Sequence, residues 1–473
     1  MAHIIKEQIK IMRENIFAQE PTYDSNNVTV VDATDWTLSP DHGLITQETL
    51  ATTGTTIALP GRYALTGSTT IPARMSQLNK LNEIGFGLSV DKDYTYDVNN
   101  TSITMKSSLA YPSQKLLPSF TVWHLYPEPE LVDVANGVVF TNLSVEFTTD
   151  KVLTYNYDIT AVKNKEIKVP SSGWNPTTQP WAINEAMPIQ DYVRALDATL
   201  YADLMVLEYD SANSKFIDVD GNEYTPLDED GDGYYEKVES GSDKWSLIDA
   251  VPVKHKDETG TEIFDEVKYL AGRKIHGVST VRLDLKTENA GNDAYRLGSR
   301  FANEYPVRKV VRQDYTGSMT VDFSSTSTQD IDSIELYNIF INGARTENVI
   351  KPTEAGFGKL SVVIKVGSAY DIKSIASKAD ERAPSAFGMN TDDPLMYASD
   401  INKPNLGSPN RSLFILPNVI LEKADKRDSA GQLKTMDMTI RMLPDDELFK
   451  EYRASGDNTL TLDFRAFAVT WLK

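Results

Sequence analysis

Two stretches of alternating apolar and polar residues, 250 positions apart, share a short pattern. Leu65–Ile71 reads Leu-Thr-Gly-Ser-Thr-Thr-Ile, and Tyr315–Val321 reads Tyr-Thr-Gly-Ser-Met-Thr-Val. In the second stretch and just beyond it, the apolar side chains of Tyr315, Met319, Val321 and Phe323 recur at a period of two, which is typical of a half-buried antiparallel strand. The shared glycine predicts a point at which another segment of the chain packs closely.

The same two elements follow each stretch. Residues 75–85 place apolar side chains at every third position and end at Gly85, which predicts a short amphipathic helix, and residues 331–342 repeat that spacing. A long hairpin comes next: 140–146 with 153–161, and 416–422 with 436–442. The repeated order strand, helix, hairpin predicts an internal duplication of a β-rich unit. The alternative is two unrelated β domains that share generic patterning.

The fold class that we expect is mainly β, with two tandem β-sandwich or barrel domains that each carry a short α-helix. A chain of 473 residues is long enough for two to four domains, each with its own core. We expect an N-terminal arm and loops over 1–60, with a helix or arm at its start. A first β domain follows over 61–206, then a small acidic β insertion over 207–272, and a second β domain over 273–473.

Composition excludes several classes of protein. The apolar content of 40% and the charged content of 24% are those of a folded soluble protein, and no apolar run reaches the roughly 20 residues of a membrane span. Cysteine is absent, which excludes disulfides and thiolate chemistry. The net charge of −21 argues against a groove that grips phosphates. It indicates either simple solubility or a surface along which a polyanion passes without sticking.

One acidic loop matches a calcium-binding pattern. Oxygen ligands at alternating positions of a twelve-residue loop, with glycine at position 6 and glutamate at position 12, suit Ca²⁺. The candidate ligands are Asp228, Asp230, Asp232, the carbonyl of Tyr234, and Glu239. The flanks are typical of strands and not of the usual helices, so the alternative is a plain acidic hairpin turn. We expect any bound Ca²⁺ to be stabilising and not catalytic.

The sequence gives little support for catalysis. The five histidines are scattered, and only His124 lies in an apolar run, where a packed core histidine is expected. A phosphate-binding loop and a nucleophile elbow are both missing from the sequence. Carboxylate pairs of the glycosidase kind cannot be identified without geometry. We expect no enzymatic activity and no catalytic residues.

The strand Leu65–Ile71, the helix after it and the hairpin 140–161 resemble the tail tube proteins of tailed bacteriophages. The stretches Arg296–Ser299, 316–323 and 412–422 extend the resemblance, which covers 60–162 and 278–472. It implies a β-sandwich or small barrel flanked by a helix, six of which form a ring. Two such units in one chain imply a homotrimeric, pseudo-hexameric ring.

The same resemblance implies that the rings stack into a virion tail tube, assembled in the host cytoplasm without a membrane. The implied partners are other copies of the chain, a tape measure protein and a tail terminator, while genomic DNA passes without specific binding. The acidic composition is similar to that of the lumen in this family, and residues 19–60 would reach the adjacent ring. The alternative function is a calcium-stabilised β-domain adhesin or other surface protein.

Overall fold

The computed structural model describes most of the chain, with gaps. The described residues are 7–41, 44–48, 55–60, 63–98, 101–112, 116–126, 130–169, 179–181, 192–210, 212–227, 237–256, 262–289, 301, 304–322, 330–342, 358–367, 410–427, 434–444, 448–449 and 465–472.

The chain is mainly β, as expected. The elements of its first part are β1 (Gln8–Arg13), β2 (Thr29–Val31), β3 (Asp35–Asp41), β4 (Leu44–Glu48), β5 (Thr55–Pro60), β6 (Ala64–Pro72), the 3-10 helix η1 (Met75–Gln77), α1 (Leu78–Phe86), β7 (Gly87–Val98), β8 (Thr101–Pro112), β9 (Phe120–Tyr126), β10 (Leu131–Thr148), β11 (Thr154–Ala161) and β12 (Lys163–Lys168). None of the described helices of the chain is long and apolar enough to cross a membrane.

The elements of the second part continue this numbering. They are the 3-10 helix η3 (Ala195–Asp197), β13 (Ala198–Asp210), β14 (Lys215–Asp218), β15 (Glu223–Leu227), β16 (Lys237–Ser240), β17 (Asp243–Lys256), β18 (Glu262–Lys274), β19 (Val278–Asn289), α2 (Glu304–Arg308), β20 (Val310–Asp322), α3 (Ser333–Asn342), β21 (Lys359–Gly367), β22 (Arg411–Arg427), β23 (Thr435–Leu443) and β24 (Phe467–Leu472).

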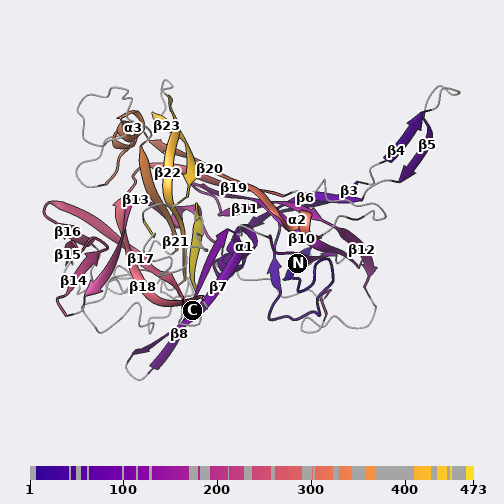
Figure 1. Cartoon of the computed structure of the whole chain (residues 1–473), viewed down its shortest axis with the longest axis horizontal. Helices are drawn as coiled ribbons and strands as arrows, with labels where there is room; N and C mark the ends of the chain where they lie inside the picture. Colours follow the sequence, from indigo (N-terminus) through magenta and orange to yellow (C-terminus); the bar gives the residue numbers. More distant parts are fainter. Residues whose placement is uncertain are drawn as a thin grey trace, which may run out of the picture.

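Eight antiparallel strands form what we call the central sheet, in the order β3-β6-β11-β10-β19-β20-β23-β22. The first four come from the N-terminal part of the chain and the last four from the C-terminal part. The two sets meet where β10 pairs with β19, with Leu143 opposite Leu285. In Figure 1 the strands β3 and β22 lie at opposite ends of this run.

The longest strand of each set branches. The N-terminal part of β10 leaves the central sheet and pairs with β9 on one side and β12 on the other. The N-terminal part of β22 likewise pairs with β21 and β24. Each branching strand therefore pairs with the strand that precedes it in the chain and with the two strands that follow it. These are β9, β11 and β12 for β10, and β21, β23 and β24 for β22.

Residues from both parts of the chain contribute to one continuous core beneath the central sheet. Period-two alternation buries Tyr155 and Tyr157 from β11, and Met436 and Met438 from β23, while the side chains between them stay on the other face. The helix α1 packs against β7, β8, β10 and β24. Burying each large apolar side chain contributes about 1.5–3 kcal/mol, so this shared core holds the two parts together.

A buried polar network reinforces the contact between α1 and the second part. The Asn82 amide donates to Ser412 Oγ at 3.3 Å and to Thr470 Oγ1 at 3.2 Å, and its carbonyl accepts a 2.7 Å bond from the Tyr155 hydroxyl. Asn82 is fully buried, so its hydrogen bonds compensate the cost of removing the amide from water.

The helices and hairpins expected from the sequence are confirmed. The first helix runs through η1 and α1. The expected end at Gly85 is wrong, because Gly85 lies inside α1 and the helix ends at Phe86, where Gly87 takes a left-handed conformation with φ of 100°. The expected second helix is α3, and the expected hairpins are β10–β11 and β22–β23.

The expected helix or arm at the N-terminus is wrong. Residues 8–13 form β1, which pairs with β2 and β9 and buries Ile9 and Ile11 in the core. The near-helical spacing was misleading because strand pairing also buries Gln8 and Lys10 on the opposite face. Within the expected arm, β4 and β5 form a separate two-stranded sheet that stands away from the body in Figure 1.

The acidic segment joins the rest of the fold through long strands. Strand β13 pairs with β21 near its start and with β18 further along, so the expected boundary at 206/207 lies inside β13. The boundary at 272/273 lies inside β18. Beyond these strands, β14, β15 and β16 form a small meander with its own buried cluster around Phe216 and Val238.

Candidate functional site

The two glycines singled out in the sequence occupy matching places in the central sheet. Gly67 of β6 lies opposite Ile159 and Leu38, and Gly317 of β20 lies opposite Ile440 and Leu283. A Cβ at Gly67 would meet the Thr37 carbonyl oxygen, and one at Gly317 would meet the Arg282 carbonyl oxygen. Thr37 and Arg282 are the residues directly before Leu38 and Leu283, so the close approach is the same in both places.

The two hairpins also share their irregularity. Each hairpin has a register shift directly after the residue that lies two strands away from the glycine. The shift falls between Phe140 and Asn142 in β10, and between Leu421 and Lys423 in β22. This shift sets Phe140 at the position of Leu421. The sequence pattern aligns Phe140 with Leu416 instead. An apolar run in a strand that is buried on both faces carries no information on register, so the sequence could not correct this alignment.

The outer face of the central sheet is polar. Between the buried rows it carries threonine, serine and asparagine side chains that bond across strands, such as Thr70 Oγ1 to Asn156 Oδ1 at 2.7 Å. Its described charged residues comprise eleven carboxylates, Asp35, Asp41, Glu146, Asp158, Asp284, Glu288, Asp314, Asp322, Glu422, Asp425 and Asp437. They comprise six cations, Arg282, Lys286, Arg312, Lys423, Arg427 and Arg441.

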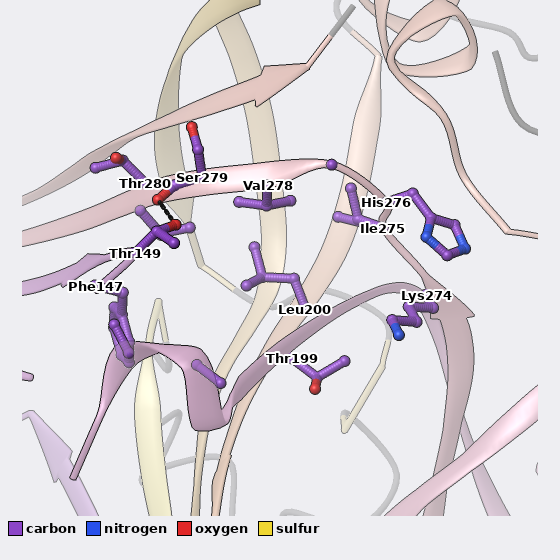
Figure 2. A pocket seen from close by; sticks show the side chains of 14 residues that line it. Phe147, Thr149, Thr199, Leu200, Lys274, Ile275, His276, Val278, Ser279 and Thr280 are labelled. Carbon is purple, nitrogen blue, oxygen red and sulfur yellow. Dashed lines mark hydrogen bonds between the residues drawn. The ribbon is translucent and has the colours of Figure 1, made fainter. Parts of the chain in front are cut away.

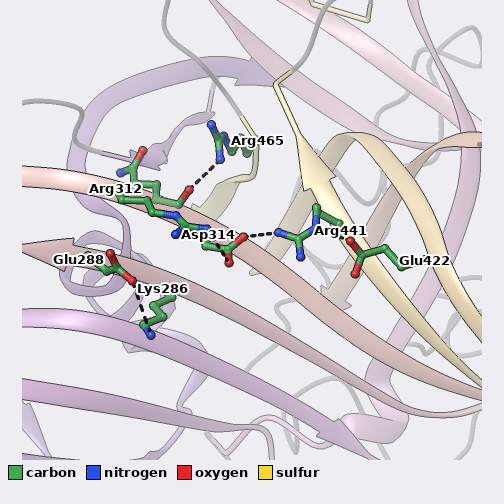
Figure 3. Close-up of polar contacts among 8 residues, drawn as sticks. Lys286, Glu288, Arg312, Asp314, Glu422, Arg441 and Arg465 are labelled. Carbon is green, nitrogen blue, oxygen red and sulfur yellow. Dashed lines mark hydrogen bonds and ion pairs between the residues drawn. The ribbon is translucent and has the colours of Figure 1, made fainter.

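Each of these six cations lies beside a carboxylate, and Figure 3 shows Lys286, Arg312 and Arg441 with theirs. Arg441 contacts both Asp314 and Glu422, and Lys286 Nζ lies 3.8 Å from Glu288 Oε1. The remaining pairs are Arg282–Asp284, Arg312–Asp314, Lys423–Asp425 and Arg427–Asp437. Exposed ion pairs contribute little to stability, about 0–1 kcal/mol each, but they neutralise the cations. The described part of this face therefore combines paired cations with a surplus of carboxylates.

A pocket of about 370 Å³ lies at the junction of the two strand sets. Its lining includes Phe147, Leu200, Lys274, His276 and Ser279. Figure 2 shows these side chains around the pocket, which lies where the ends of β10, β13, β18 and β19 meet. The hydroxyl of Thr149 donates to the Ser279 carbonyl at 2.7 Å, which ties the turn after β10 to the start of β19. The described lining residues include no carboxylate, but the ring of His276 lies beside the Asp330 carboxylate.

Most of the predicted calcium ligands lie outside the described residues. These are Asp228, Asp230, Asp232 and Tyr234. The fifth, Glu239, lies in β16 opposite Thr225 of β15 and Lys244 of β17. The strand flanks expected from the sequence are confirmed on the β15 side, and the loop joins two antiparallel strands. In the part of the chain that the structure describes, no group of three or more His, Asp or Glu side chains is placed to hold a metal ion.

His124 lies in the core of the β1–β9 sheet, as its apolar run predicts. Its Nε2 lies 3.1 Å from Glu7 Oε2, and it packs at 4.1 Å, centroid to centroid, from Tyr126. Burial lowers the pKa of His124, and the Glu7 carboxylate opposes that shift. This environment is that of a packed core histidine.

A buried charge cluster was missed by the sequence reading. Asp249 of β17 accepts a 2.6 Å bond from Arg411 Nε and lies 3.3 Å from Lys365 Nζ. The Arg411 guanidinium also lies over the Trp471 ring at 5.2 Å. Burial is the main cause that lowers the pKa of Lys365. No sequence signal identifies this cluster, since its members are far apart in the chain.

Comparison with protein-family models and with the sequences of curated proteins finds no match for this chain. The assignment of function therefore depends on the geometry of the central sheet.

Proposed function

We propose that this chain is a structural protein that assembles with copies of itself into stacked rings forming a bacteriophage tail tube. The observation that carries the proposal is the repeated arrangement within the central sheet. The orders β3-β6-β11-β10 and β19-β20-β23-β22 match strand for strand, with the glycines and the register shifts at matching places. A duplicated β module explains all of these matches together.

A chain that carries two equivalent modules is suited to a ring with twice as many modules as chains. Three chains would give a pseudo-hexameric homotrimer, because closed cyclic symmetry treats each module as one subunit. In this proposal the polar face of the central sheet lines the channel. Its surplus carboxylates repel DNA phosphates, and its paired cations offer them no free positive charge, so DNA stays mobile.

Other parts of the fold suit the outside of such a tube. The hairpins β4–β5 and β7–β8 both extend from the body in Figure 1, and we propose that they contact adjacent rings. The β14–β16 meander lies away from the central sheet and would decorate the outer wall. A tape measure protein inside the tube and a terminator at its end remain the proposed partners, with the virion tail as the location.

Electron microscopy of the purified protein tests this proposal. We expect rings or tubes with a hollow centre, and light scattering that gives a trimer or a multiple of it. A monomer at every concentration would contradict the proposal. The alternative function, a calcium-stabilised adhesin or surface protein, is favoured by the separate meander around the acidic loop. It predicts a monomer whose melting temperature rises strongly with calcium.

A further inference from the structure

We propose that the free edge of β22 in one copy of this chain pairs with β3 of a second copy, repeating the β10–β19 junction between chains. The inference rests on the proposed function only in requiring that copies assemble side by side. It adds which strands meet, in which direction and in which register.

The template is the junction inside one chain. There β10 and β19 run antiparallel, with Asn142 opposite Lys286, Ser144 opposite Asp284, and Glu146 opposite Arg282. This pairing joins the last strand of the first four-strand set to the first strand of the second set. The matching strands at the two ends of the central sheet are β22 and β3.

Both end strands have one unpaired edge among the described residues. The pairing of β22 with β21 ends at Ile420, so the stretch 421–427 pairs only with β23. Strand β3 pairs only with β6. Unpaired edges of this length are sites at which another strand can add.

Burial along the two pairs of strands differs as this inference requires. In β10, the outer-face residues Asn142, Ser144 and Glu146 are only partly exposed, because β19 covers that edge. The matching part of β22 is open, with side-chain exposures of 65% at Lys423, 51% at Asp425 and 72% at Arg427. Strand β3 is exposed at five of its seven positions, Asp35, Thr37, Ser39, Pro40 and Asp41, whereas the matching stretch 280–286 of β19 is exposed only at Arg282 and Lys286.

The register follows from matching positions. Phe140, opposite Ile159, matches Leu421, opposite Ile440, which relates β10 to β22 by 281 positions. Leu38 matches Leu283, which relates β3 to β19 by 245. Carrying the pairs of the β10–β19 junction across sets Lys423 opposite Asp41 of the second copy. It likewise sets Asp425 opposite Ser39, and Arg427 opposite Thr37.

The chemistry of these pairs agrees with the register. Lys423 and Asp41 carry opposite charges, and opposite charges directly across an antiparallel pair stabilise it. Pro40, opposite Ala424, has no N–H and contributes at most one backbone bond, so the edge is poor at indiscriminate strand addition. The charged pair next to it then selects the partner strand.

Disulfide trapping tests this register. The chain has no cysteine of its own, so only the introduced cysteines can form disulfides. The variant Ser39→Cys/Asp425→Cys should give covalent dimers and trimers under mild oxidation, since the two Cβ atoms would lie within reach of one bond. The pair Thr37→Cys/Lys423→Cys, four residues out of register, should give less than about a tenth of that yield. The intramolecular pair Ser144→Cys/Asp284→Cys reports whether the equivalent junction geometry permits a bond.

The outcomes separate this inference from the proposed function. If the protein forms rings or tubes but Ser39→Cys/Asp425→Cys gives no covalent species, the proposed edge pairing is wrong. The proposed tail tube function would then still stand. If the protein stays monomeric, both proposals fail. Cross-linking of Ser39→Cys alone would show β3 against β3 and would overturn the inference.

Charge reversal gives an independent test. Lys423→Asp and Asp41→Lys should each weaken assembly, by about fivefold in the association constant per junction, because like charges then face each other. The double variant should restore assembly to near the original level. A double variant no better than either single change would contradict the proposed pair.

Discussion

The carbonyl oxygen of Thr37 lies so close to Gly67 that a Cβ at position 67 would be 1.9 Å from it. The neighbouring strand leaves room for a hydrogen at this position and for nothing larger. The same relationship recurs between Gly317 and the carbonyl oxygen of Arg282, where the distance would be 2.7 Å. Both glycines are thus explained by close backbone packing between β3 and β6 and between β19 and β20.

Gly67→Ala should destabilise the protein by about 2–4 kcal/mol, and Gly317→Ala should cost less, because its nearest contact is longer. Chemical denaturation measures both. Thr66→Ala, at an exposed position of the same strand, is the control and should change the free energy of unfolding by about 0.5 kcal/mol or less. Equal stability of Gly67→Ala and the unchanged protein would contradict the close approach.

The buried charges around Asp249 give a second prediction. Arg411→Met should destabilise by about 3–5 kcal/mol, because it leaves the Asp249 carboxylate buried without its main partner. Asp249→Leu/Arg411→Met removes both charges and should cost clearly less than the sum of the single changes. Denaturation of the four proteins gives the coupling energy, and strict additivity would show that the pair does not interact.

Lys10 predicts an unusual dependence of stability on pH. Its side chain is fully buried beside the Tyr23 ring, and burial lowers the pKa of its amine from 10.5 to about 8. Between these two values the unfolded chain binds more protons than the folded one, so stability rises with pH. The gain across the window is at most about 3 kcal/mol.

Lys10→Met should remove this rise and stabilise the protein at pH 7 by about 1–3 kcal/mol. The measurement is the difference in unfolding free energy between the two proteins from pH 7 to 10.5. This difference cancels the titration of groups common to both. A difference that does not change with pH would show that the amine titrates normally.

Local patterning predicted much of the central sheet, and the reasons are physical. Alternation identifies β11 and β23 because one face is buried and the other polar. The short helices were found from apolar spacing that ends near glycine or Asn-Gly. Register in β10 and β22 was beyond the sequence, because a strand that is buried on both faces shows no alternation along Val138–Phe140 or Leu413–Leu416.

The candidate site was less accessible to sequence reasoning. The polar face assembles from strands up to 400 positions apart, and each strand alone is indistinguishable from an ordinary solvated surface. Ion pairs such as Arg441 with Asp314 depend on tertiary pairing. The acidic loop was visible because its spacing is local, although spacing alone does not decide between calcium binding and a turn.

The acidic loop yields a test of calcium binding. If Asp228, Asp230, Asp232 and Glu239 hold Ca²⁺, free calcium at about 100 times its Kd should stabilise the protein by about 2.7 kcal/mol. Asp230→Asn should abolish most of that gain. Asp220→Asn, in the neighbouring turn, is the matched control and should keep it. Melting curves with calcium and with a chelator measure the effect, and identical curves would favour the plain hairpin turn.

The charge pattern on the polar face gives the last prediction, which addresses passage of DNA. Asp314→Asn/Asp437→Asn removes the carboxylates that pair with Arg312 and Arg427, while Arg441 keeps its contact with Glu422. The freed cations should contact phosphates, so the variant should bind a short DNA duplex at low salt more tightly than the unchanged protein. Binding should weaken steeply with salt, with a slope of log K against log salt that is greater by about one to two.

A matched control separates this face from net charge. Asp220→Asn/Asp243→Asn changes the charge by the same amount on the β14–β17 segment, remote from the central sheet. The two variants are compared at about 0.1 M salt, where long-range repulsion falls off over a Debye length of about 10 Å, so this control should leave DNA binding nearly unchanged. If the control binds DNA as tightly as the polar-face variant, overall charge governs the effect. The polar face would then have no particular role in keeping DNA mobile.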